Sequence, residues 1–314
     1  MAAVSTPTDR TGAPDDKRRA GRRKATKKSD RIAYLYLLPA FVLFGIFLLF
    51  PLIHGFWISL YQWDGLSAST WVGLRNYGEA FSDPGLRSAF VHSLVLIVFY
   101  ALIPVSLALL LTAVMSRARH TKGLGFFRVV LFLPQVVASV VVATIWTAIY
   151  APQGVLNDFL SAIGLHAITK PWLGDFTWAL PAVGLIGTWV EIGLCLVLFL
   201  AGVSQIPREL FEAARIDGAG AIREFFTVTL PGLRPQIAVA LTLSVVAGLK
   251  SFDLIYVATR GGPGTQTSVP AFEVYHRAFD VGQVGSACAI GILLTLLILI
   301  ATVVINRVDP GESR

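Results

Sequence analysis

Six long apolar stretches constrain what this chain can fold into more than any other feature of its sequence. A helix needs about 20 mainly apolar residues to cross the roughly 30 Å of hydrocarbon in a bilayer. Runs of that length, bounded by charge, proline or glycine, recur along the chain. We therefore expect an all-α, polytopic membrane protein with six transmembrane helices. The expected spans cover about residues 32–60, 89–115, 129–150, 178–203, 235–258 and 286–306.

The composition agrees with lipid as the main solvent of the chain. Hydrophobic residues make up 55% of it, charged residues only 14%, and the mean hydropathy is +0.68. A water-soluble domain usually carries about 25% charged residues. The first apolar run is too long for the core of a cleaved secretory signal, and no small-residue cleavage pattern follows it. We expect this run to remain in place as the first span.

The first 31 residues have a different character. They are rich in Lys, Arg, Thr, Asp and Gly and have almost nothing to bury, which predicts a disordered, basic cytoplasmic tail. This tail holds much of the formal net charge of +7. A basic cluster beside an apolar span is better explained as a topology signal than as a nucleic-acid site. Contact of the tail with anionic membrane lipid stays open beside a purely topogenic role.

Lys and Arg in short loops orient the spans, because positively charged flanks stay on the cytoplasmic side. If the N-terminus is inside, most of these residues fall in cytoplasmic segments. The external side and the membrane then receive only Arg75, Arg87, Lys170, Lys250, Arg260 and Arg277. We expect a multi-pass protein of the cell (inner, cytoplasmic) membrane with both termini cytoplasmic. Its transmembrane domain would cover residues 32–307.

Residues 204–234, called here the interspan segment, separate the fourth and fifth spans. The interspan segment is too polar for lipid and too long to be a turn. Its first half predicts a short amphipathic helix with acidic residues in the early turns. Gly218 breaks this pattern, a second short helix is expected at about 221–228, and Pro231 is expected to end it.

The spacing of residues in the interspan segment resembles the EAA loop of ABC importer permeases. Val228 stands where the family has Ile, and the matching positions are Glu212, Ala213, Ala214, Gly218, Val228, Leu230 and Pro231. Other stretches look like carbohydrate-importer permeases: Val72–Tyr77 resembles the first external loop, and Phe132–Leu160 the third span with its following loop. Phe252–Thr267 resembles the Phe-Asp-x-Ile-Tyr...Gly-Gly-Pro signature. The likeness covers about Ile32 to Arg307.

The resemblance implies a permease subunit of a carbohydrate-uptake ABC importer. Such a subunit forms half of the translocation pathway with a second, related permease. It sits on two ATP-binding subunits and takes sugar from an extracytoplasmic binding protein, by alternating access driven by ATP hydrolysis. The EAA loop would couple the ATPases to the spans through Glu212, Ala213, Ala214, Asp217, Gly218, Val228, Leu230 and Pro231.

No enzyme activity and no bound cofactor are expected on this chain itself. It lacks the Gly-x4-Gly-Lys-Ser/Thr loop that cradles nucleotide phosphates, so ATP and Mg²⁺ would be used by the partner ATPase subunits. Cys195 and Cys288 lie in apolar stretches with no partner at metal-ligand spacing, which predicts packing roles and no metal site.

Polar residues inside spans are costly and are therefore candidates for the substrate pathway. Glu191 in the fourth span leads, with Trp189 beside it as an apolar face for a sugar ring; pairing of Glu191 with the partner permease stays open. Lys250 and Asp253, three residues apart in the fifth span, are expected to neutralise each other rather than to touch substrate. Gln135 is a weaker candidate. Because Lys250 is the only intramembrane cation, a neutral sugar is favoured over a phosphorylated one.

A glycine-rich stretch after the fifth span predicts a tight external loop made by Gly261, Gly262 and Pro263. This outer loop would contact the binding protein or shape an outer gate, and a plain turn would use the same residues.

Two other classes of membrane protein explain the sequence less well. A secondary transporter would show internal repeats, and it leaves Glu212–Pro231 unexplained. A membrane-embedded enzyme would need a metal or nucleophile motif, and the chain carries no His-Glu-x-x-His and no Gly-x-Ser-x-Gly.

Overall fold

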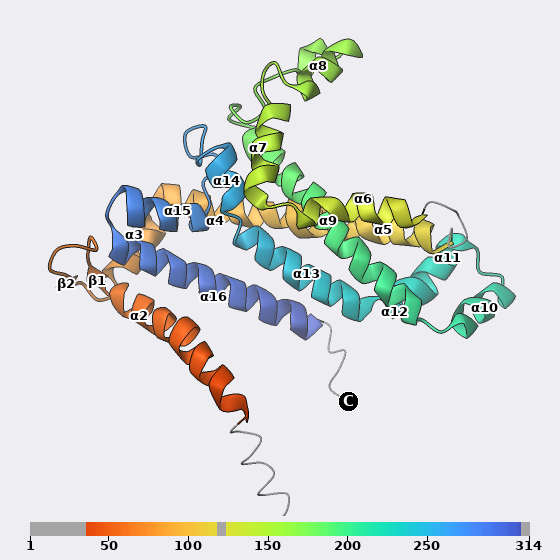
Figure 1. The fold of residues 1–314 in the computed structure, drawn as a ribbon, viewed down its shortest axis with the longest axis horizontal. Coiled ribbons are helices and arrows are strands. Elements are labelled where there is room, and N and C mark those ends of the chain that lie inside the picture. The colour runs from red at the N-terminus through yellow and green to blue at the C-terminus, as the bar shows by residue number, and fades with distance from the viewer. Residues whose placement is uncertain (1–35, 118–123, 309–314) are drawn as a thin grey trace, which may run out of the picture. The chain divides into compact units, whose positions relative to one another are not determined.

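The computed structural model describes residues 36–117 and 124–308, so the tail predicted for residues 1–31 lies outside the described residues. The chain divides into two compact units, Met1–Gly55 and Phe56–Arg314, which we describe separately. The described residues are mostly helical, which confirms the all-α prediction (Figure 1). Their only strands are the two-residue β1 (Tyr61–Gln62) and β2 (Thr70–Trp71), which pair antiparallel.

The first unit contributes the apolar helix of the first span. This helix passes through a π-helical turn, η1 (Gly45–Leu49), and continues as α2 (Phe50–Ile58), whose last residues belong to the second unit. The stretch Tyr36–Ile58 is long and apolar enough to cross a membrane. It ends close to the boundary expected from the sequence.

Within the described ranges, five helices could cross a membrane, and a bent pair makes a sixth if it counts as one span. In the second unit the full-length spans are Pro84–Ser116, Ala179–Gln205, Arg234–Ala258 and Val284–Arg307. They are built from α4 (Pro84–Ile97), η2 (Val98–Leu102), α5 (Ile103–Arg117), α9 (Ala179–Gln205), α13 (Arg234–Leu249), α14 (Asp253–Ala258) and α16 (Val284–Val308). The prediction of six spans agrees with this arrangement.

The second span begins at Pro84, five residues before the predicted start. Asp83 is the reason, because its Oδ1 accepts hydrogen bonds from the backbone N–H of Gly85 at 2.8 Å and of Leu86 at 3.4 Å. An aspartate cap followed by proline at the first helical position is a strong helix start. Hydropathy alone places the boundary too late, because this first turn is polar.

The third span is not the continuous helix predicted for residues 129–150. It consists of α6 (Leu124–Val136) and α7 (Ser139–Ile149), and the two axes are bent by 101°. Pro134 lies inside α6 and removes one intrahelical donor, which weakens the last turn. Ala138 then adopts an extended ψ of 134° and starts α7 in a new direction. Proline in this apolar run was the signal for the break.

The interspan segment contains α10 (Arg208–Ile216), α11 (Ala221–Glu224), the π-helical turn η4 (Phe225–Thr229) and α12 (Leu230–Gly232). The two predicted short helices are therefore present. The prediction that Pro231 ends the second one is wrong, since the chain stays helical to Gly232. In η4 the N–H of Leu230 bonds to the carbonyl of Phe225, five residues back, and this wider turn accommodates the proline that follows.

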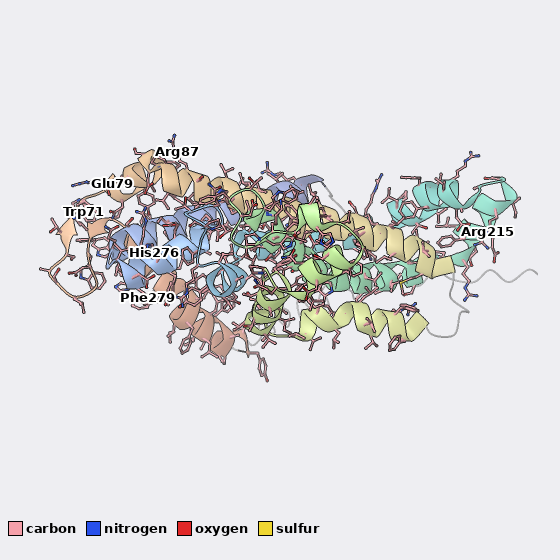
Figure 2. The ribbon with its side chains drawn as sticks, turned by 90° about the horizontal axis from the view of Figure 1, so that it is seen from above. Trp71, Glu79, Arg87, Arg215, His276 and Phe279 are labelled. Carbon is pink, nitrogen blue, oxygen red and sulfur yellow. The ribbon has the colours of Figure 1, made fainter. Side chains whose placement is uncertain are left out.

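Short elements gather at the two ends of the second unit. At one end, called here the hairpin end, lie β1, β2, α3 (Arg75–Ser82), α15 (Pro270–Tyr275) and η5 (His276–Asp280). The interspan segment lies at the opposite end, called here the α10 end, as α10 in Figure 1 and Arg215 in Figure 2 show. Helix α8 (Val155–Ala162) and the 3₁₀ turn η3 (His166–Ile168) follow α7.

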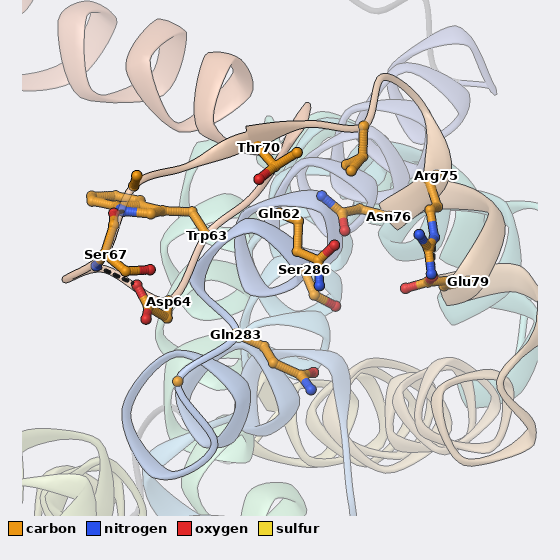
Figure 3. Close-up of a pocket in the computed structure, with 13 residues that line it drawn as sticks. Gln62, Trp63, Asp64, Ser67, Thr70, Arg75, Asn76, Glu79, Gln283 and Ser286 are labelled. Atoms are coloured by element: carbon orange, nitrogen blue, oxygen red, sulfur yellow. Dashed lines mark hydrogen bonds and ion pairs between the residues drawn. The ribbon is translucent and has the colours of Figure 1, made fainter.

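The hairpin end holds a polar cavity of about 410 Å³, shown in Figure 3. Asn76 fixes its wall, because the Asn76 Nδ2 donates to the carbonyls of Ser59 at 2.7 Å and Tyr61 at 2.9 Å. Gln62 and Gln283 present their amides to this cavity from opposite walls. The start of β1 is therefore held in place from α3.

Helix α9 is the central helix of the second unit and packs against α5, α6 and α13. Glycines let the neighbours come close: a Cβ added at Gly187 would lie 2.2 Å from Tyr100 Cε2, and one at Gly193 would lie 2.5 Å from the carbonyl oxygen of Leu131. Small residues at helix contacts are a main source of packing energy in lipid. The core of this unit is thus set by backbone proximity as much as by large side chains.

An ionic network ties the hairpin end together. Arg277, with 17% of its side chain exposed, donates to the Asp83 carboxylate at 2.5 Å and to Ser286 Oγ at 3.0 Å, and its Nε lies 3.6 Å from Glu273 Oε2. Partial burial opposes ionisation of Asp83, but the bonds from Arg277 and the backbone outweigh it, so the pKa of Asp83 is lowered. The start of α4 is thereby joined to α15 and α16.

Replacing Gly193 with Ala tests the close approach of α6 and α9. The new methyl would meet backbone atoms of Leu131 and Phe132, which cannot rotate away, so we expect the free energy of unfolding to fall by about 1–3 kcal/mol. The measurement is thermal unfolding in detergent, followed by intrinsic fluorescence. Gly125→Ala in α6 is the control, because nothing lies within 4 Å of its added Cβ. Equal stability of the two variants would contradict this packing.

Asp83→Asn tests the ionic network through its pH dependence. A carboxyl whose pKa is lowered by folding adds stability above its ordinary pKa of about 3.9, and this stability is lost as the pH falls through the lowered value. We expect wild type to exceed the variant by roughly 1 kcal/mol at neutral pH, since the Asp83 side chain is 37% exposed. The difference should vanish in acid. A difference independent of pH would contradict this assignment, and exposed Asp158→Asn is the control.

Candidate functional site

The first half of the interspan segment forms a stiff, exposed helix with a defined end. Helix α10 closes in a Schellman motif: Ala219 N–H bonds to the carbonyl of Ala214 at 2.8 Å and Gly218 N–H to that of Arg215 at 3.0 Å. Gly218 has a φ of +75°, which a glycine adopts without strain. The glycine at this position of the predicted EAA loop therefore makes the turn that was expected of it.

The residues of α10 that match the EAA pattern face outward. Glu212 and Ala213 are exposed, Ala214 is half-buried, and Asp217 and Gly218 are exposed. Among the described residues, the Glu212 carboxylate has no hydrogen-bond or ion-pair partner. A free carboxylate beside two small side chains leaves this face of α10 open to a second protein.

An ion pair fixes α10 to α11. Arg215 Nε donates to Glu224 Oε2 at 2.8 Å, and the Glu224 side chain is only 9% exposed. The hydrogen bond to Glu224 raises the pKa of Arg215, so this guanidinium stays charged. The two short helices are therefore joined to each other. Of the other EAA positions, Val228 in η4 and Leu230 in α12 are half-buried, and Pro231 in α12 is exposed.

Large apolar side chains of the interspan segment are exposed to an unusual degree. Ile216 is 86% exposed, Ile222 75% and Phe226 60%. The last two also line an apolar groove of about 890 Å³ against α5. Exposed apolar surface of this kind marks contact with a partner protein or with lipid.

A second polar site lies among the spans. A cavity of about 180 Å³, called here the α9 cavity, is lined by polar side chains from five elements or their connections, namely Tyr100, Gln135, Ser139, Glu191, Ser251 and Asp253. It thus brings together three predicted pathway residues from separate spans: Gln135, Glu191 and Asp253. Tyr100 and Ser251 complete it, with Tyr100 Oη 3.0 Å from Ser251 Oγ.

Hydrogen-bond acceptors dominate the α9 cavity. Glu191 is 5% exposed and accepts one hydrogen bond, from Ser244 Oγ at 3.1 Å to its Oε2. Gln135 Oε1 is buried and has no hydrogen-bond partner in the described part of the chain. A buried oxygen without a donor is unfavourable unless a ligand or water supplies one. The cavity is therefore chemically suited to a ligand that carries many O–H donors.

Two predicted pathway residues do not line the α9 cavity. Trp189 lies two positions from Glu191 on α9, and residues at that spacing point to different sides of a helix. Its ring packs on Trp146 instead, with centroids 5.6 Å apart. The proposed sugar-stacking role of Trp189 beside Glu191 is therefore wrong for this cavity.

The expected neutralisation of Lys250 by Asp253 is also wrong. Helix α13 ends at Leu249, Lys250 is its C-cap and Asp253 begins α14, so a break in the helix removes the i, i+3 relation on which the prediction depended. No ion pair joins them in the described ranges, and Lys250 is exposed. Asp253 turns to the α9 cavity while Lys250 does not.

The predicted outer loop is a tight turn at the hairpin end of α14. Gly261 has a φ of +82°, a Cβ there would lie 2.9 Å from Phe272, and Gly262–Pro263 is a cis peptide. Thr267 closes the turn by bonding from its N–H to the Gly261 carbonyl at 3.1 Å and from its Oγ1 to that of Gly262 at 2.8 Å.

Beside this loop lies a further cavity of about 410 Å³, called here the α14–α15 cavity, lined in part by Tyr256, Arg260, Ser268, Phe272, Glu273 and His276. Sequence reasoning did not single out Arg260. Arg260 stands out only in the structure, because it is the one non-glycine residue with a positive φ, +50°, among those described. Tyr100 was missed as well, because a tyrosine in an apolar run does not lower the hydropathy enough to stand out.

The part of the chain that the structure describes contains no metal centre that could explain these sites. Within residues 36–117 and 124–308, no three His, Cys, Asp or Glu side chains are grouped to hold a metal ion. Cys195 is buried and Cys288 half-buried, both as free thiols.

Comparison with known proteins agrees with this geometry. The probable ABC transporter permease protein YurN of Bacillus subtilis is 36% identical over 270 residues, which cover 85% of this chain and 92% of YurN. The trehalose/maltose transport system permease protein MalF of Thermococcus litoralis is 33% identical, covering 91% of this chain and 96% of MalF. A crystal structure of a bacterial alginate ABC transporter, in complex with its alginate pentasaccharide-bound periplasmic protein, matches with a TM-score of 0.76 at 25% identity, covering 89% of this chain and 94% of that one.

A protein-family model matches about two thirds of the chain. The model of binding-protein-dependent transport system inner membrane components matches residues 108–314, which contain the interspan segment, the outer loop and every polar residue of the α9 cavity named above except Tyr100. This chain belongs to the family of inner membrane components of binding-protein-dependent transport systems, and it is a multi-pass ABC transporter permease.

Proposed function

We propose that this permease carries a neutral saccharide, with the α9 cavity as its half of the transmembrane binding site. The observation that carries this proposal is the unpartnered, buried Gln135 Oε1 beside the Glu191 and Asp253 carboxylates. These acceptors suit the hydroxyl groups of a saccharide. Two carboxylates and no lining cation disfavour an anionic cargo in this cavity.

The proposal includes the partners that the family requires. A second, related permease completes the pathway, two ATP-binding subunits use ATP and Mg²⁺, and an extracytoplasmic binding protein delivers the saccharide. This chain binds no nucleotide. Support comes from the alginate transporter, solved with its saccharide-bound periplasmic protein, and from the trehalose/maltose permease of Thermococcus litoralis.

The α10 end is proposed to be cytoplasmic and both termini with it. Arg208, Arg215, Arg223 and Arg234 lie in or next to the interspan segment, and positively charged flanks stay inside. The hairpin end would then face the binding protein, and the outer loop at Gly261–Pro263 would lie on that side.

Coupling is proposed to act through α10 as a rigid docking helix. Glu212 would accept charge-assisted hydrogen bonds from an ATP-binding subunit, and Ala213 would allow close approach. The Arg215–Glu224 ion pair and the turn at Gly218 would make α10 and α11 move together. Movement of α10 would then reach the α9 cavity along α9, which ends at Gln205, three residues before α10 begins.

Reconstitution of the complete importer in liposomes, with its binding protein, tests the proposal as a whole. We expect ATP-dependent uptake of a neutral saccharide, with maltose and trehalose as the first probes, and no uptake without the binding protein. Uptake of anionic saccharides only, or ATP hydrolysis by this chain in isolation, would contradict it.

Glu212→Ala tests coupling. We expect loss of at least tenfold in ATP hydrolysis stimulated by loaded binding protein, because a charge-assisted hydrogen bond is worth about 1.5–3 kcal/mol. Glu209→Ala, another exposed carboxylate on α10, is the matched control and should stay near wild type. Unchanged assembly and hydrolysis in Glu212→Ala would show that α10 is not the coupling helix.

Glu191→Ala tests the α9 cavity. Removing the carboxylate leaves Ser244 Oγ without its acceptor and takes one acceptor from the saccharide, so uptake should fall by about tenfold or more. Glu191→Gln keeps the volume and one acceptor and should retain more uptake than Glu191→Ala. Both rates are measured with ATP hydrolysis alongside. If neither variant changes uptake, Glu191 does not belong to the pathway.

A further inference from the structure

The residues that line the α14–α15 cavity have no role in the proposed coupling or in the proposed binding site at the α9 cavity. It opens beside the outer loop, where α14 ends and α15 and η5 pass it. Helix α14 contributes to both cavities: Asp253 lines the α9 cavity, and Tyr256, three residues later, lines the α14–α15 cavity. Residues at that spacing share one face of a helix. The two cavities therefore follow one another along α14.

The carboxylates of the α14–α15 cavity are already satisfied by the protein. Glu273 accepts from Ser268 Oγ at 2.6 Å and faces Arg277 Nε at 3.6 Å, and Asp280 pairs with His276 Nδ1 at 2.9 Å. Arg260 differs from them, since no carboxylate lies within ion-pair distance of it among the residues that the structure describes. Its guanidinium is the cavity's positively charged hydrogen-bond donor without a carboxylate partner in the described residues.

The backbone holds Arg260 in a conformation that an arginine rarely adopts. Its φ is +50°, and its N–H bonds to the carbonyl of Ile255 at 2.7 Å, so it folds back on the end of α14. The guanidinium carbon lies 5.9 Å from the centre of the Tyr256 ring, within the range of a cation–π contact. Arg260 thus closes the end of α14 from the left-handed position that glycine usually occupies at a helix end.

Aromatic rings extend from this arginine in a continuous row. The centroid of Tyr256 lies 5.2 Å from that of Phe252 and 5.0 Å from that of Tyr275, and Tyr275 lies 5.1 Å from Phe279. Phe279 is 76% exposed and lies with His276 at the hairpin end (Figure 2). The row thus leads from an exposed ring towards Asp253 and the α9 cavity.

We propose that the α14–α15 cavity is a second, outer saccharide-binding site, at which Arg260 donates hydrogen bonds to vicinal hydroxyls of a neutral saccharide before it enters the α9 cavity. The planar guanidinium presents several N–H groups in a fork that matches a pair of neighbouring oxygens. Tyr256 and Phe272 line this cavity and offer aromatic surface to the C–H face of a sugar ring. A neutral ligand fits the sequence of sites, because the α9 cavity that follows presents carboxylates.

This inference rests on the proposed function, and Arg260→Gly separates the two. Glycine adopts a φ of +50° without strain, so this variant removes the guanidinium while the loop keeps its conformation. Its unfolding midpoint should equal or exceed that of wild type. A structural role for Arg260 predicts the opposite change in stability.

The readout is binding of labelled maltose or trehalose, whichever the wild-type importer takes up, to the complete membrane complex without binding protein. We expect Arg260→Gly to weaken this binding roughly tenfold. The affinity of Arg260→Lys should lie between those of wild type and Arg260→Gly. Arg87→Gln is the control, because it removes an exposed positive charge at the same end, outside the cavity (Figure 2). It should bind as wild type does.

Three results would overturn the outer site. The first is unchanged binding in Arg260→Gly, and the second is an equal loss in Arg87→Gln. The third is tighter binding of a uronate disaccharide than of the neutral one by wild type. If wild type still takes up the neutral saccharide, each of these results contradicts the outer site alone and not the proposed function. If wild type takes up no neutral saccharide, the proposed function itself is contradicted.

Discussion

Four glycines of α9 bring this helix against its neighbours, and most of the second unit depends on that approach. A Cβ at Gly184, Gly187, Gly193 or Gly202 would lie 2.2–2.6 Å from an atom of Phe99, Tyr100, Leu131 or Leu233. In lipid, apolar side chains gain little from leaving the solvent, so close van der Waals contact between helices has to supply the packing energy. The glycines permit that contact.

The same helix carries the buried acid and leads to the docking helix. Glu191 lies fourteen residues before Gln205, a distance of about 21 Å along a helix axis. A buried carboxylate is costly in a span, and one bond from Ser244 compensates only part of that cost. Helix α9 is packed against α5, α6 and α13, and only Ile206 and Pro207 separate it from α10. In the proposed mechanism, α9 is therefore the shortest connection between α10 and the α9 cavity.

The number of spans and the interspan helices could be predicted from the sequence, because these depend on local composition and spacing. Glu191, Gln135 and Asp253 were also found, since any polar group in an apolar run stands out. The wrong predictions concern the directions of side chains and helices. Lys250 and Asp253 were predicted to share one helix, Trp189 was predicted to face the same site as Glu191, and the third span was predicted to be one continuous helix. Side-chain direction depends on the break after Leu249 and the bend at Ala138, and hydropathy reports neither of them.

The bend between α6 and α7 places two helix ends inside the span. Thirteen residues of α6 and eleven of α7 extend about 20 Å and 16 Å, so neither alone crosses the hydrocarbon. Ala138 provides no side-chain cap, and Ser139, the first residue of α7, lines the α9 cavity. The N-terminus of a helix carries a partial positive charge of about half a unit. The positive end of the α7 dipole therefore lies at the cavity that also holds the Glu191 and Asp253 carboxylates, and it offsets part of their negative charge.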